Sequence, residues 1–432
     1  MARWWMAALL ALTAVTASAA ETPAALAARL LDRLQARDYV AVEAMFAPSM
    51  AQAVPAEKLQ GAWESLPAQF GAYKQRGDAQ VSESRGMQIA LTRLQFERGA
   101  VDAQIAIDAD GNVAGLWLQP VAEVIPLPAV PADAPYRETE VSVGAGEKAL
   151  PATLAMPKGA GPFPAVVLIH GSGPQDRNET IGPNRPFLDI ARDLASQGIA
   201  VLRYEKRTRV HPQAFAQGVY TVDDETTDDA VAALALLRTL DGVDPERVFV
   251  LGHSQGGMLA PRVAQRAPYV AGVILLAAPA RSLLTILPEQ NRRLLGAQAD
   301  GEPGKAFLAK LDAQIAHVRN PATAAEDTDT PLGLPVGYWR SIEAVDPVGD
   351  AQRIKQPLLF LQGGRDLQVV DADWQRWQAA FKQDPRATFQ LYPALNHLAI
   401  AGQGPASLAE YQQPGHVDAT LVADVARWIK GN

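Results

Sequence analysis

The sequence predicts a doubly wound, mostly parallel α/β sheet for residues 136–432 and a small α+β domain before it. In the larger part, apolar runs such as 165–169 are uninterrupted, as in strands buried on both faces of a parallel sheet. These runs alternate with stretches of helical periodicity, which is the pattern of a doubly wound fold. Prolines concentrated between residues 120 and 135 separate this part of the chain from the preceding one.

The first 20 residues have the composition of a secretory signal peptide. Arg3 supplies a positive charge, an apolar run follows from Trp4 to Val15, and residues 17–20 are small. The alternative is an uncleaved anchor, but this run is shorter than the ~20 residues that span a bilayer. We therefore expect cleavage, export to the periplasm or the medium, and no stable membrane insertion afterwards.

Residues 21–119 predict one small domain. Leucines recur at helical spacing after Thr22-Pro23, and a second helical stretch covers 58–70. Several strands follow, with Asp110-Gly111-Asn112 as a turn between two of them. Helices followed by a curled antiparallel sheet resemble the nuclear-transport-factor-2-like superfamily, whose domains precede some secreted bacterial hydrolases.

The segment 120–135 is predicted to be an extended linker, because its prolines disfavour helix. These prolines are Pro120, Pro126, Pro128, Pro131 and Pro135.

The domain that follows alternates between strands and helices. Its predicted parallel strands are 165–169, 198–202, 248–251, 273–276, 358–361 and 387–392, and its predicted helices are 187–196, 224–239, 258–265, 374–381 and one ending near 429. Thr221 and Asp224 predict a capping box, and Gly198 suits a left-handed helix end. Residues 138–143 and 152–156 are expected to add an antiparallel edge.

About 80 residues separate the strand that ends at Leu276 from the strand that begins at Leu358, which is far longer than an ordinary connection. Leucine-rich helical stretches fill the first part of this segment, and a loop covers 321–335. We expect residues 281–345 to form a helical cap over the carboxyl edge of the sheet.

The composition excludes several kinds of function. The formal net charge is -8 and the pI is about 5.4, which argues against nucleic acid or an anionic membrane as the main partner. The chain has no cysteine, so it has no disulfide, no thiolate nucleophile and no thiolate metal site. Its histidines are scattered and it lacks a Gly-rich phosphate loop with a lysine, so we expect neither a metal nor a cofactor.

The central motif is Gly252-His253-Ser254-Gln255-Gly256, between an apolar run and a helical stretch. A serine on a tight strand-to-helix turn needs glycines two residues before and after it, because side chains there would clash. The alternative is a chance Gly-Ser loop. The context favours a nucleophile elbow with Ser254 as nucleophile.

A serine nucleophile needs a base, and His397 follows the predicted last strand, 387–392. His416 is the alternative, but it stands beside the C-terminal helix and fits a capping role. His253 lies within the elbow and is expected to point away from the serine oxygen. The remaining histidines, His211 and His317, fit surface or cap positions.

The base in turn needs a carboxylate, and Asp366 follows the strand 358–361 at the same sheet edge as Ser254. The alternative is a turn or capping acid, a role that Asp371 and Asp373 fit better because a helix begins beside them. The order serine, aspartate, histidine is that of the α/β-hydrolases.

The negative oxygen of a tetrahedral intermediate must accept hydrogen bonds from N–H groups. One donor is expected to be the backbone N–H of Gln255, directly after the nucleophile. The other is expected in His170-Gly171-Ser172-Gly173, from the N–H of Ser172 with that of Gly173 as the alternative.

Residues 136–432 resemble the α/β-hydrolase superfamily, and the run from His170 to Asn178 is similar to an exported bacterial group related to dienelactone-hydrolase-like and acyl esterases. Residues 203–208 resemble the segment with which this superfamily commonly braces its oxyanion loop, so we interpret their charges as structural.

Together these features predict a serine hydrolase that cleaves small-molecule carboxylic esters with small or medium acyl groups. A serine peptidase or thioesterase with the same triad is one alternative. A non-catalytic binding protein on a hydrolase scaffold is another, which the three filled triad positions disfavour.

Overall fold

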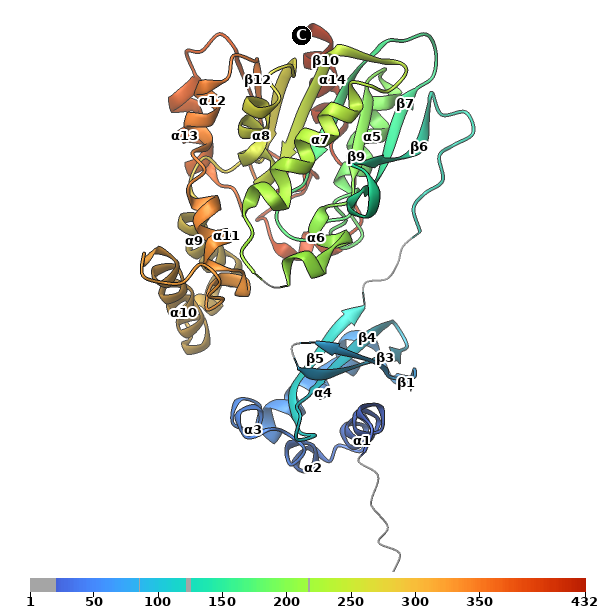
Figure 1. Cartoon of the computed structure of the whole chain (residues 1–432), viewed down its shortest axis with the longest axis vertical. Helices are drawn as coiled ribbons and strands as arrows, with labels where there is room; N and C mark the ends of the chain where they lie inside the picture. Colours follow the sequence, from blue (N-terminus) through green and yellow to red (C-terminus); the bar gives the residue numbers. More distant parts are fainter. Residues whose placement is uncertain (1–20, 85, 122–125, 217) are drawn as a thin grey trace, which may run out of the picture. The chain divides into compact units, whose positions relative to one another are not determined.

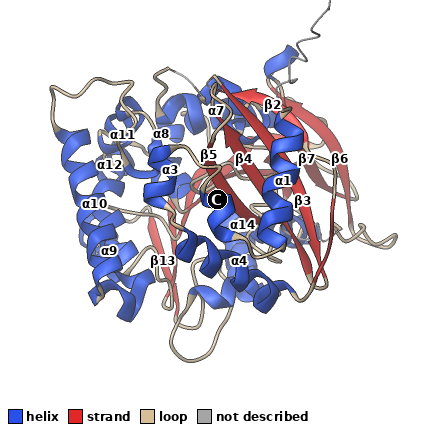
Figure 2. Ribbon diagram, turned by 90° about the horizontal axis from the view of Figure 1, so that it is seen from below, coloured by secondary structure: helices blue, strands red, loops and turns tan. Residues whose placement is uncertain are grey.

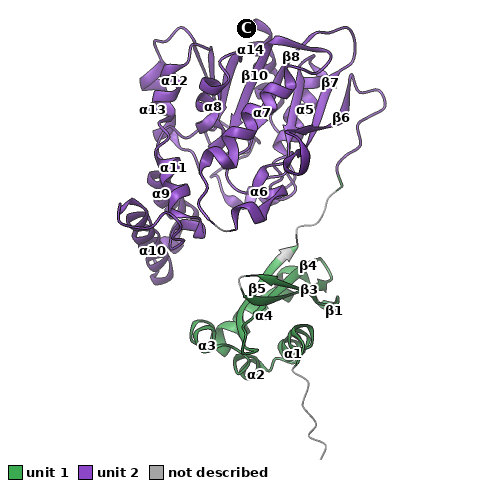
Figure 3. Cartoon of the chain, viewed as in Figure 1, with its two compact units in different colours: residues 1–126 green, residues 127–432 purple. Residues whose placement is uncertain are grey.

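The computed structural model describes residues 21–84, 86–121, 126–216 and 218–432. The chain divides into Met1–Pro126 and Leu127–Asn432, which we call the N-terminal unit and the C-terminal unit (Figure 3). The predicted signal peptide lies outside the described residues. Within those residues, no helix combines the length and the apolar character that a membrane span requires.

The N-terminal unit packs helices against an antiparallel sheet with the order β1-β3-β4-β5, and β2 also pairs with β3. Its elements are α1 Pro23–Gln35, α2 Tyr39–Glu43, α3 Pro48–Ala53, α4 Ala56–Phe70, β1 Tyr73–Arg76, β2 Gln80–Ser84, β3 Met87–Phe96, β4 Gly99–Ile107 and β5 Val113–Val121. The predicted start of α1 is confirmed, because Thr22 Oγ1 accepts the N–H of Ala25 at 3.2 Å. The short helices α2 and α3 were not predicted.

The strands of this unit follow the expected turn signals. Gly111, in the predicted turn between β4 and β5, has a φ of +81° that favours glycine. β5 lies at the edge of the sheet and continues through Pro120, a position that tolerates a residue without an N–H. Leucines of α1 and apolar residues of β3 and β4 form one core.

The C-terminal unit contains a mixed sheet with the order β13-β12-β11-β10-β8-β9-β7-β6. The strands are β6 Tyr136–Val143, β7 Leu150–Pro157, β8 Phe163–Ile169, β9 Ala200–Tyr204, β10 Val243–His253, β11 Gly272–Leu276, β12 Leu358–Gly363 and β13 Ala387–Tyr392. The strands from β13 to β9 pair in parallel, whereas β7 and β6 pair antiparallel. The predicted fold class, including its antiparallel edge, is therefore confirmed.

Helices cover both faces of this sheet (Figures 1 and 2). They are α5 Pro186–Ser196, α7 Asp228–Leu237, α8 Gln255–Arg266, α12 Pro347–Arg353, α13 Asp371–Phe381 and α14 Ala419–Gly431, whereas the short α6 Arg207–Val210 lies in the connection after β9. One core joins α7, α8 and α13 to one face, and a second joins α5 and α14 to the other. Side chains of β8 alternate between the two cores, as burial on both faces requires.

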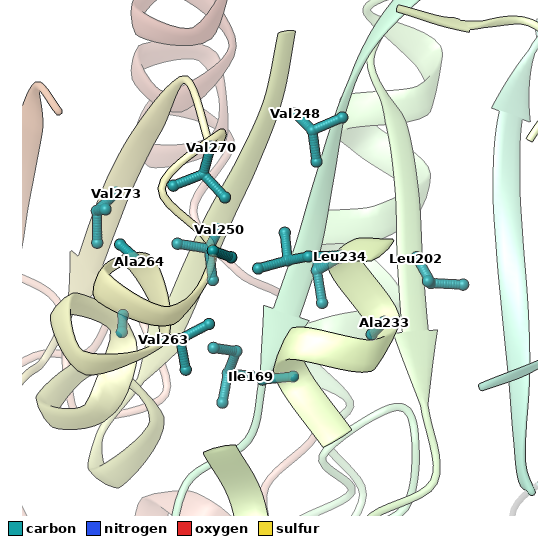
Figure 4. Packing of buried hydrophobic residues seen from close by; sticks show 14 of the residues in the cluster. Ile169, Leu202, Ala233, Leu234, Val248, Val250, Val263, Ala264, Val270 and Val273 are labelled. Carbon is teal, nitrogen blue, oxygen red and sulfur yellow. The ribbon is translucent and has the colours of Figure 1, made fainter. Parts of the chain in front are cut away.

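Figure 4 shows the first of these cores from close by. Ile169 of β8, Val250 of β10 and Val273 of β11 pack against Leu234 of α7 and Val263 of α8. These branched aliphatic side chains fix the spacing between the sheet and its helices, and therefore the positions of the loops at the strand ends.

The segment that leads into α7 begins with the predicted capping box of Thr221 and Asp224. The capping box is present, because the N–H of Thr221 donates to Asp224 Oδ2 at 2.8 Å and the N–H of Asp224 donates to Thr221 Oγ1 at 3.3 Å. The helix that follows does not begin as a regular α-helix, however. Its first turn is the π-helical segment η3 Asp223–Thr227, which the sequence pattern did not predict.

The segment between β11 and β12 is helical, as expected. It contains α9 Leu283–Leu295, α10 Glu302–Arg319 and α11 Val336–Glu343, which pack on one another (orange in Figure 1). Val222, Met258 and Leu259 of the sheet-bearing part share a core with these helices. We call residues 281–345 the cap.

Candidate active site

Ser254 occupies a strained turn between β10 and α8. Its φ is +53°, in the left-handed region that non-glycine residues rarely adopt. A Cβ on Gly252 would overlap the carbonyl oxygen of Gly256, and a Cβ on Gly256 would overlap that of Ile169. The backbone N–H of Ser254 donates to Leu276 O at 2.9 Å, which ties the turn to β11. The glycines therefore stand where this turn admits no side chain.

His397 and Asp366 form a buried pair. Nδ1 of His397 lies 2.7 Å from Oδ2 of Asp366, and both side chains are buried. The other carboxylate oxygen of Asp366 accepts the N–H groups of Gln368 and Val369 at 2.7 and 3.0 Å. The carboxylate is thus held by the loop after β12 and is aimed at the imidazole.

Ser254 and His397 lie at the same edge of the sheet. The ring of His253, the residue before Ser254, is 4.7 Å from the ring of His397 between centroids. Across the described parts of the chain, no hydrogen bond joins the hydroxyl of Ser254 to His397. Hydrogen bonds between catalytic groups are often long without substrate and shorten when it binds.

The alternative site residues occupy other places. His416 is 88% exposed and lies 3.2 Å from Asp189. The cap of α14 is Asp418, so the capping role expected of His416 was wrong. Asp373 is buried and binds Arg281 at 2.9 Å, so it is a structural partner of the cap's first residues.

The two predicted oxyanion-hole donors, Ser172 and Gln255, line the same cavity as Ser254. As the first residue of α8, Gln255 has no acceptor for its N–H within the helix. The N–H of Ser172 makes no hydrogen bond to any described residue. Both donors are therefore free to bind an anion beside Ser254.

Two buried pairs, Glu179 with His253 and Lys206 with Glu225, hold the loop that carries Ser172. Glu179 Oε1 accepts the N–H of Gly171 at 2.6 Å, and Lys206 Nζ donates to the carbonyl of Gly171 at 2.9 Å. Glu179 also pairs with His253 at 2.9 Å. Lys206 also pairs with Glu225 at 3.0 Å. The expected brace of the oxyanion loop is present: within the 203–208 segment Lys206 contacts Gly171, and Arg203 and Glu205 bind Asn178 and Arg177 further along the loop.

The cap joins this network through Tyr338. Its hydroxyl donates to Glu225 Oε2 at 2.8 Å and accepts a hydrogen bond from Gln255 Nε2 at 3.2 Å. Gln255 Nε2 also donates to Glu225 Oε2 at 3.1 Å. Residues from the cap, the π-helical turn and the elbow therefore meet at one buried carboxylate.

A cavity of about 520 Å³ opens above Ser254 and is lined mainly by apolar side chains from the cap and the neighbouring loops. These include Phe215, Leu283, Ile286, Leu287, Leu334 and Trp339. Its polar lining residues include Ser172, Gln255, Glu225 and Tyr338, and no lysine, arginine or histidine is among its described lining residues. A covered, mainly apolar pocket with a few polar groups is typical of a small-molecule site.

Burial and charge shift the pKa values of several groups near the site. Burial lowers the pKa of His170 to about 4, so its imidazole is neutral at neutral pH. Burial raises the pKa of Tyr220, which lines the cavity, to about 12. In the described parts of the chain, no cluster of three or more His, Asp or Glu side chains has the arrangement of a metal site.

Glu179, Glu225 and Tyr338 were not predicted from the sequence as site residues. Glu179 comes directly after the motif 170–178 and bonds a residue 74 positions away, whereas Tyr338 and Glu225 are 113 positions apart. A signal for Glu179 was present, because a carboxylate close to the oxyanion loop is a natural partner for its N–H groups. No local pattern marks the other two.

Two family models match the chain. The model described as "Alpha/beta hydrolase family" matches residues 166–410, which is more than half of the chain. A second model, described as "Protein of unknown function (DUF3887)", matches residues 27–116 in the N-terminal unit.

Named relatives match over most of their length. Esterase EstD of Thermotoga maritima is 35% identical over 376 residues, which cover 86% of this chain and 87% of that protein. A putative carboxymethylenebutenolidase of Methylorubrum extorquens is 22% identical over 78% of this chain and 91% of that protein. Among solved structures, an esterase from Pyrobaculum calidifontis is 16% identical with a TM-score of 0.45, over 68% of this chain and 83% of that one. The alignment with EstD is longer than the C-terminal unit, so it includes part of the N-terminal unit.

Proposed function

This chain belongs to the alpha/beta hydrolase family, and on that premise we propose that it hydrolyses carboxylic esters through an acyl-enzyme formed on Ser254. The relative that is 35% identical is named an esterase, which supports the class of reaction. The observation that carries the proposal is the buried His397–Asp366 pair, at the sheet edge where Ser254 opens into an apolar cavity.

In the first half of the proposed reaction, Ser254 Oγ attacks the ester carbonyl carbon while His397 Nε2 accepts the hydroxyl proton. Asp366 accepts a hydrogen bond from Nδ1–H of His397, so Nε2 is the nitrogen with the free lone pair. The carboxylate of Asp366 also stabilises the imidazolium that forms. The carbonyl oxygen becomes an oxyanion, which accepts hydrogen bonds from the N–H groups of Ser172 and Gln255. The intermediate then expels the alcohol, which takes the proton from His397.

In the second half, water replaces the alcohol. The oxygen of the water molecule attacks the acyl carbon while His397 accepts a proton from that water. The same two N–H groups hold the second oxyanion. Collapse of this intermediate breaks the bond to Ser254 Oγ, which recovers its proton from His397, and the carboxylic acid leaves.

The cavity supports acyl groups of small or medium size. Contact with its apolar side chains removes the hydrocarbon of an acyl group from water, which stabilises the bound substrate by roughly 25 cal/mol per Å² of buried surface. The α9 residues Leu283, Ile286 and Leu287 lie at helical spacing on its wall, so the cap contributes to this contact surface.

The proposal is tested with a fluorophosphonate probe and a panel of nitrophenyl esters graded by acyl length, with one amide and one thioester. We expect stoichiometric labelling of the protein and the fastest turnover with short or medium esters. The variant Ser254→Ala should lose both labelling and turnover. The matched control is Ser196→Ala, because Ser196 is exposed at the end of α5.

Equal labelling of Ser254→Ala and Ser196→Ala would contradict the assigned nucleophile. Faster turnover of the amide or the thioester than of every ester would contradict the assigned bond, because the same triad serves peptidases and thioesterases.

A further inference from the structure

His253 is a buried residue whose two ring nitrogens both face hydrogen-bond acceptors. Nε2 lies 2.8 Å from the backbone carbonyl oxygen of His397, and Nδ1 lies 2.9 Å from Oε2 of Glu179. A carbonyl oxygen only accepts, so Nε2 must carry a proton. An ionised carboxylate also only accepts, so Nδ1 must carry a proton whenever Glu179 is charged.

We propose that His253 is an imidazolium at neutral pH and that, with the carboxylate of Glu179, it positions the general base by joining the three loops of the catalytic site. We call these two residues the Glu179–His253 pair. The protonation state is inferred from geometry alone, whereas its effect on catalysis rests on the proposed function.

Each end of the pair holds a different loop. Glu179 Oε1 accepts the N–H of Gly171 in the oxyanion loop at 2.6 Å, and its Oε2 holds His253 in the elbow. The opposite edge of the His253 ring holds the backbone of His397. The distance between the base and the nucleophile therefore depends on one imidazole that donates in two directions.

The charges around the pair favour the ionised form. Burial alone would lower the pKa of His253, but the charge and hydrogen bond of Glu179 and the carbonyl of His397 raise it above the usual value. Burial alone would raise the pKa of Glu179, but His253 and the N–H of Gly171 lower it. Each partner thus stabilises the charge of the other.

Other titratable groups also face the pair. They are His397 and Asp366 from the loops after β13 and β12, His170 after β8, and Lys206, which holds the same Gly171 peptide. His170 is neutral at neutral pH because burial lowers its pKa to about 4. Asp366 adds a second negative charge that favours the imidazolium.

Deprotonation of His253 would remove one of its two donors. A lone pair would then face either the carbonyl of His397 or the carboxylate of Glu179, and one contact would become repulsive. Folding raises the pKa of His253, so its imidazolium stabilises the folded state. This stabilisation is complete below the pKa of about 6.5 in the unfolded chain and is lost as pH rises through the pKa in the folded chain. An alkaline decline of kcat is the expected consequence.

The direct test is NMR of the full chain with ¹⁵N-labelled histidine, with the variant Ser254→Ala as a second sample. The His253 signals are assigned by their loss in His253→Gln. We expect both ring nitrogens of His253 to be protonated at neutral pH in either sample. A neutral ring with a single N–H would overturn the inference, since it would mean that Glu179 carries the proton.

The conservative variant Glu179→Gln keeps the acceptor for Gly171 but replaces the charged oxygen with an amide. The amide N–H₂ faces Nδ1, so His253 should become neutral. We expect kcat to fall about 10- to 100-fold with little change in KM, as for a small displacement of a catalytic group. Unchanged kcat with a neutral His253 would overturn the positioning role.

The matched control is His416→Gln, because His416 and Asp189 form an exposed histidine–carboxylate pair outside the site. It should leave the His253 signals and kcat unchanged. The alkaline decline of kcat should persist in this control and be absent from His253→Gln. An identical alkaline decline in His253→Gln would overturn the assignment of that decline to His253. Failure of the proposed esterase function would leave the NMR result standing, because that measurement needs no substrate.

Discussion

The ammonium group of Lys206 lies 2.9 Å from the carbonyl oxygen of Gly171, and this contact fixes the peptide unit whose N–H belongs to Ser172. The C=O and N–H of a trans peptide point in opposite directions. An ammonium on the carbonyl side therefore aims the Ser172 N–H away from Lys206. It also polarises the peptide, which makes that N–H a stronger donor.

The variant Lys206→Met should lose this orientation. We expect kcat to fall about 100- to 1000-fold, as when one oxyanion-hole donor is removed. The variant also leaves Glu225 as an uncompensated buried charge, which should lower the free energy of unfolding by about 3–5 kcal/mol. Steady-state kinetics and denaturant unfolding measure the two effects.

The double variant Lys206→Met/Glu225→Gln separates these effects, because Glu225→Gln removes the unpaired charge without restoring the contact to Gly171. Stability should recover while kcat remains low. Recovery of kcat together with stability would show that Lys206 acts on folding alone.

Replacing Asp366 with asparagine tests the base. Oδ1 can still accept the N–H groups of Gln368 and Val369, so the loop is expected to remain folded. The new amide would face Nδ1 of His397 and favour the wrong tautomer, so kcat should fall about 10⁴-fold. Activity within a factor of ten of wild type would exclude Asp366 as the partner of the base. The control is Asp371→Asn, because Asp371 is exposed in the first turn of α13.

The parts of the site that were predicted from sequence are those that local patterns define. The elbow around Ser254 combines an uninterrupted apolar run, a tight Gly-x-Ser-x-Gly turn and a helix. Asp366 and His397 each come a few residues after a predicted strand, and parallel strands bring their carboxyl ends to one edge. The order of these signals along the chain was sufficient to predict a common site.

The parts that were not predicted depend on contacts between distant residues. Tyr338 comes from the cap and reaches Glu225 across 113 positions, and neither residue belongs to a spacing pattern. Glu225 also lies in a π-helical turn of five residues, which is too short to be distinguished from an α-helix by its pattern of hydrophobic residues. The short helices α2 and α3 were missed because five and six residues are too few to establish a period.

The close packing of the elbow predicts that Gly256→Ala will destabilise the C-terminal unit. The added methyl group would overlap the carbonyl oxygens of Ile169 and His170, both of which belong to backbone at the end of β8. The free energy of unfolding should fall by about 1–3 kcal/mol or more, because backbone must move to admit it. Denaturant unfolding monitored by circular dichroism measures the loss.

The matched control is Gly61→Ala in the middle of α4, where the added methyl group would have no heavy atom within 4 Å outside its own helix backbone and chain neighbours. Alanine there should stabilise the helix by about 0.5–1 kcal/mol. An unchanged midpoint for Gly256→Ala would contradict the tight turn.

The cavity wall on α9 predicts how acyl-chain preference can be changed. Leu287 lines the cavity beside Leu283 and Ile286, so Leu287→Trp should fill part of the space that a longer acyl chain needs. Turnover of nitrophenyl acetate should change little, whereas kcat/KM for a medium-chain ester should fall about tenfold or more, the range expected when hydrocarbon is excluded from a pocket. Leu408→Trp is the control, because Leu408 is exposed and lies outside the cavity lining. An equal decline for short and medium esters would mean that the substitution disturbs the catalytic groups, and that α9 does not set the length of the acyl chain.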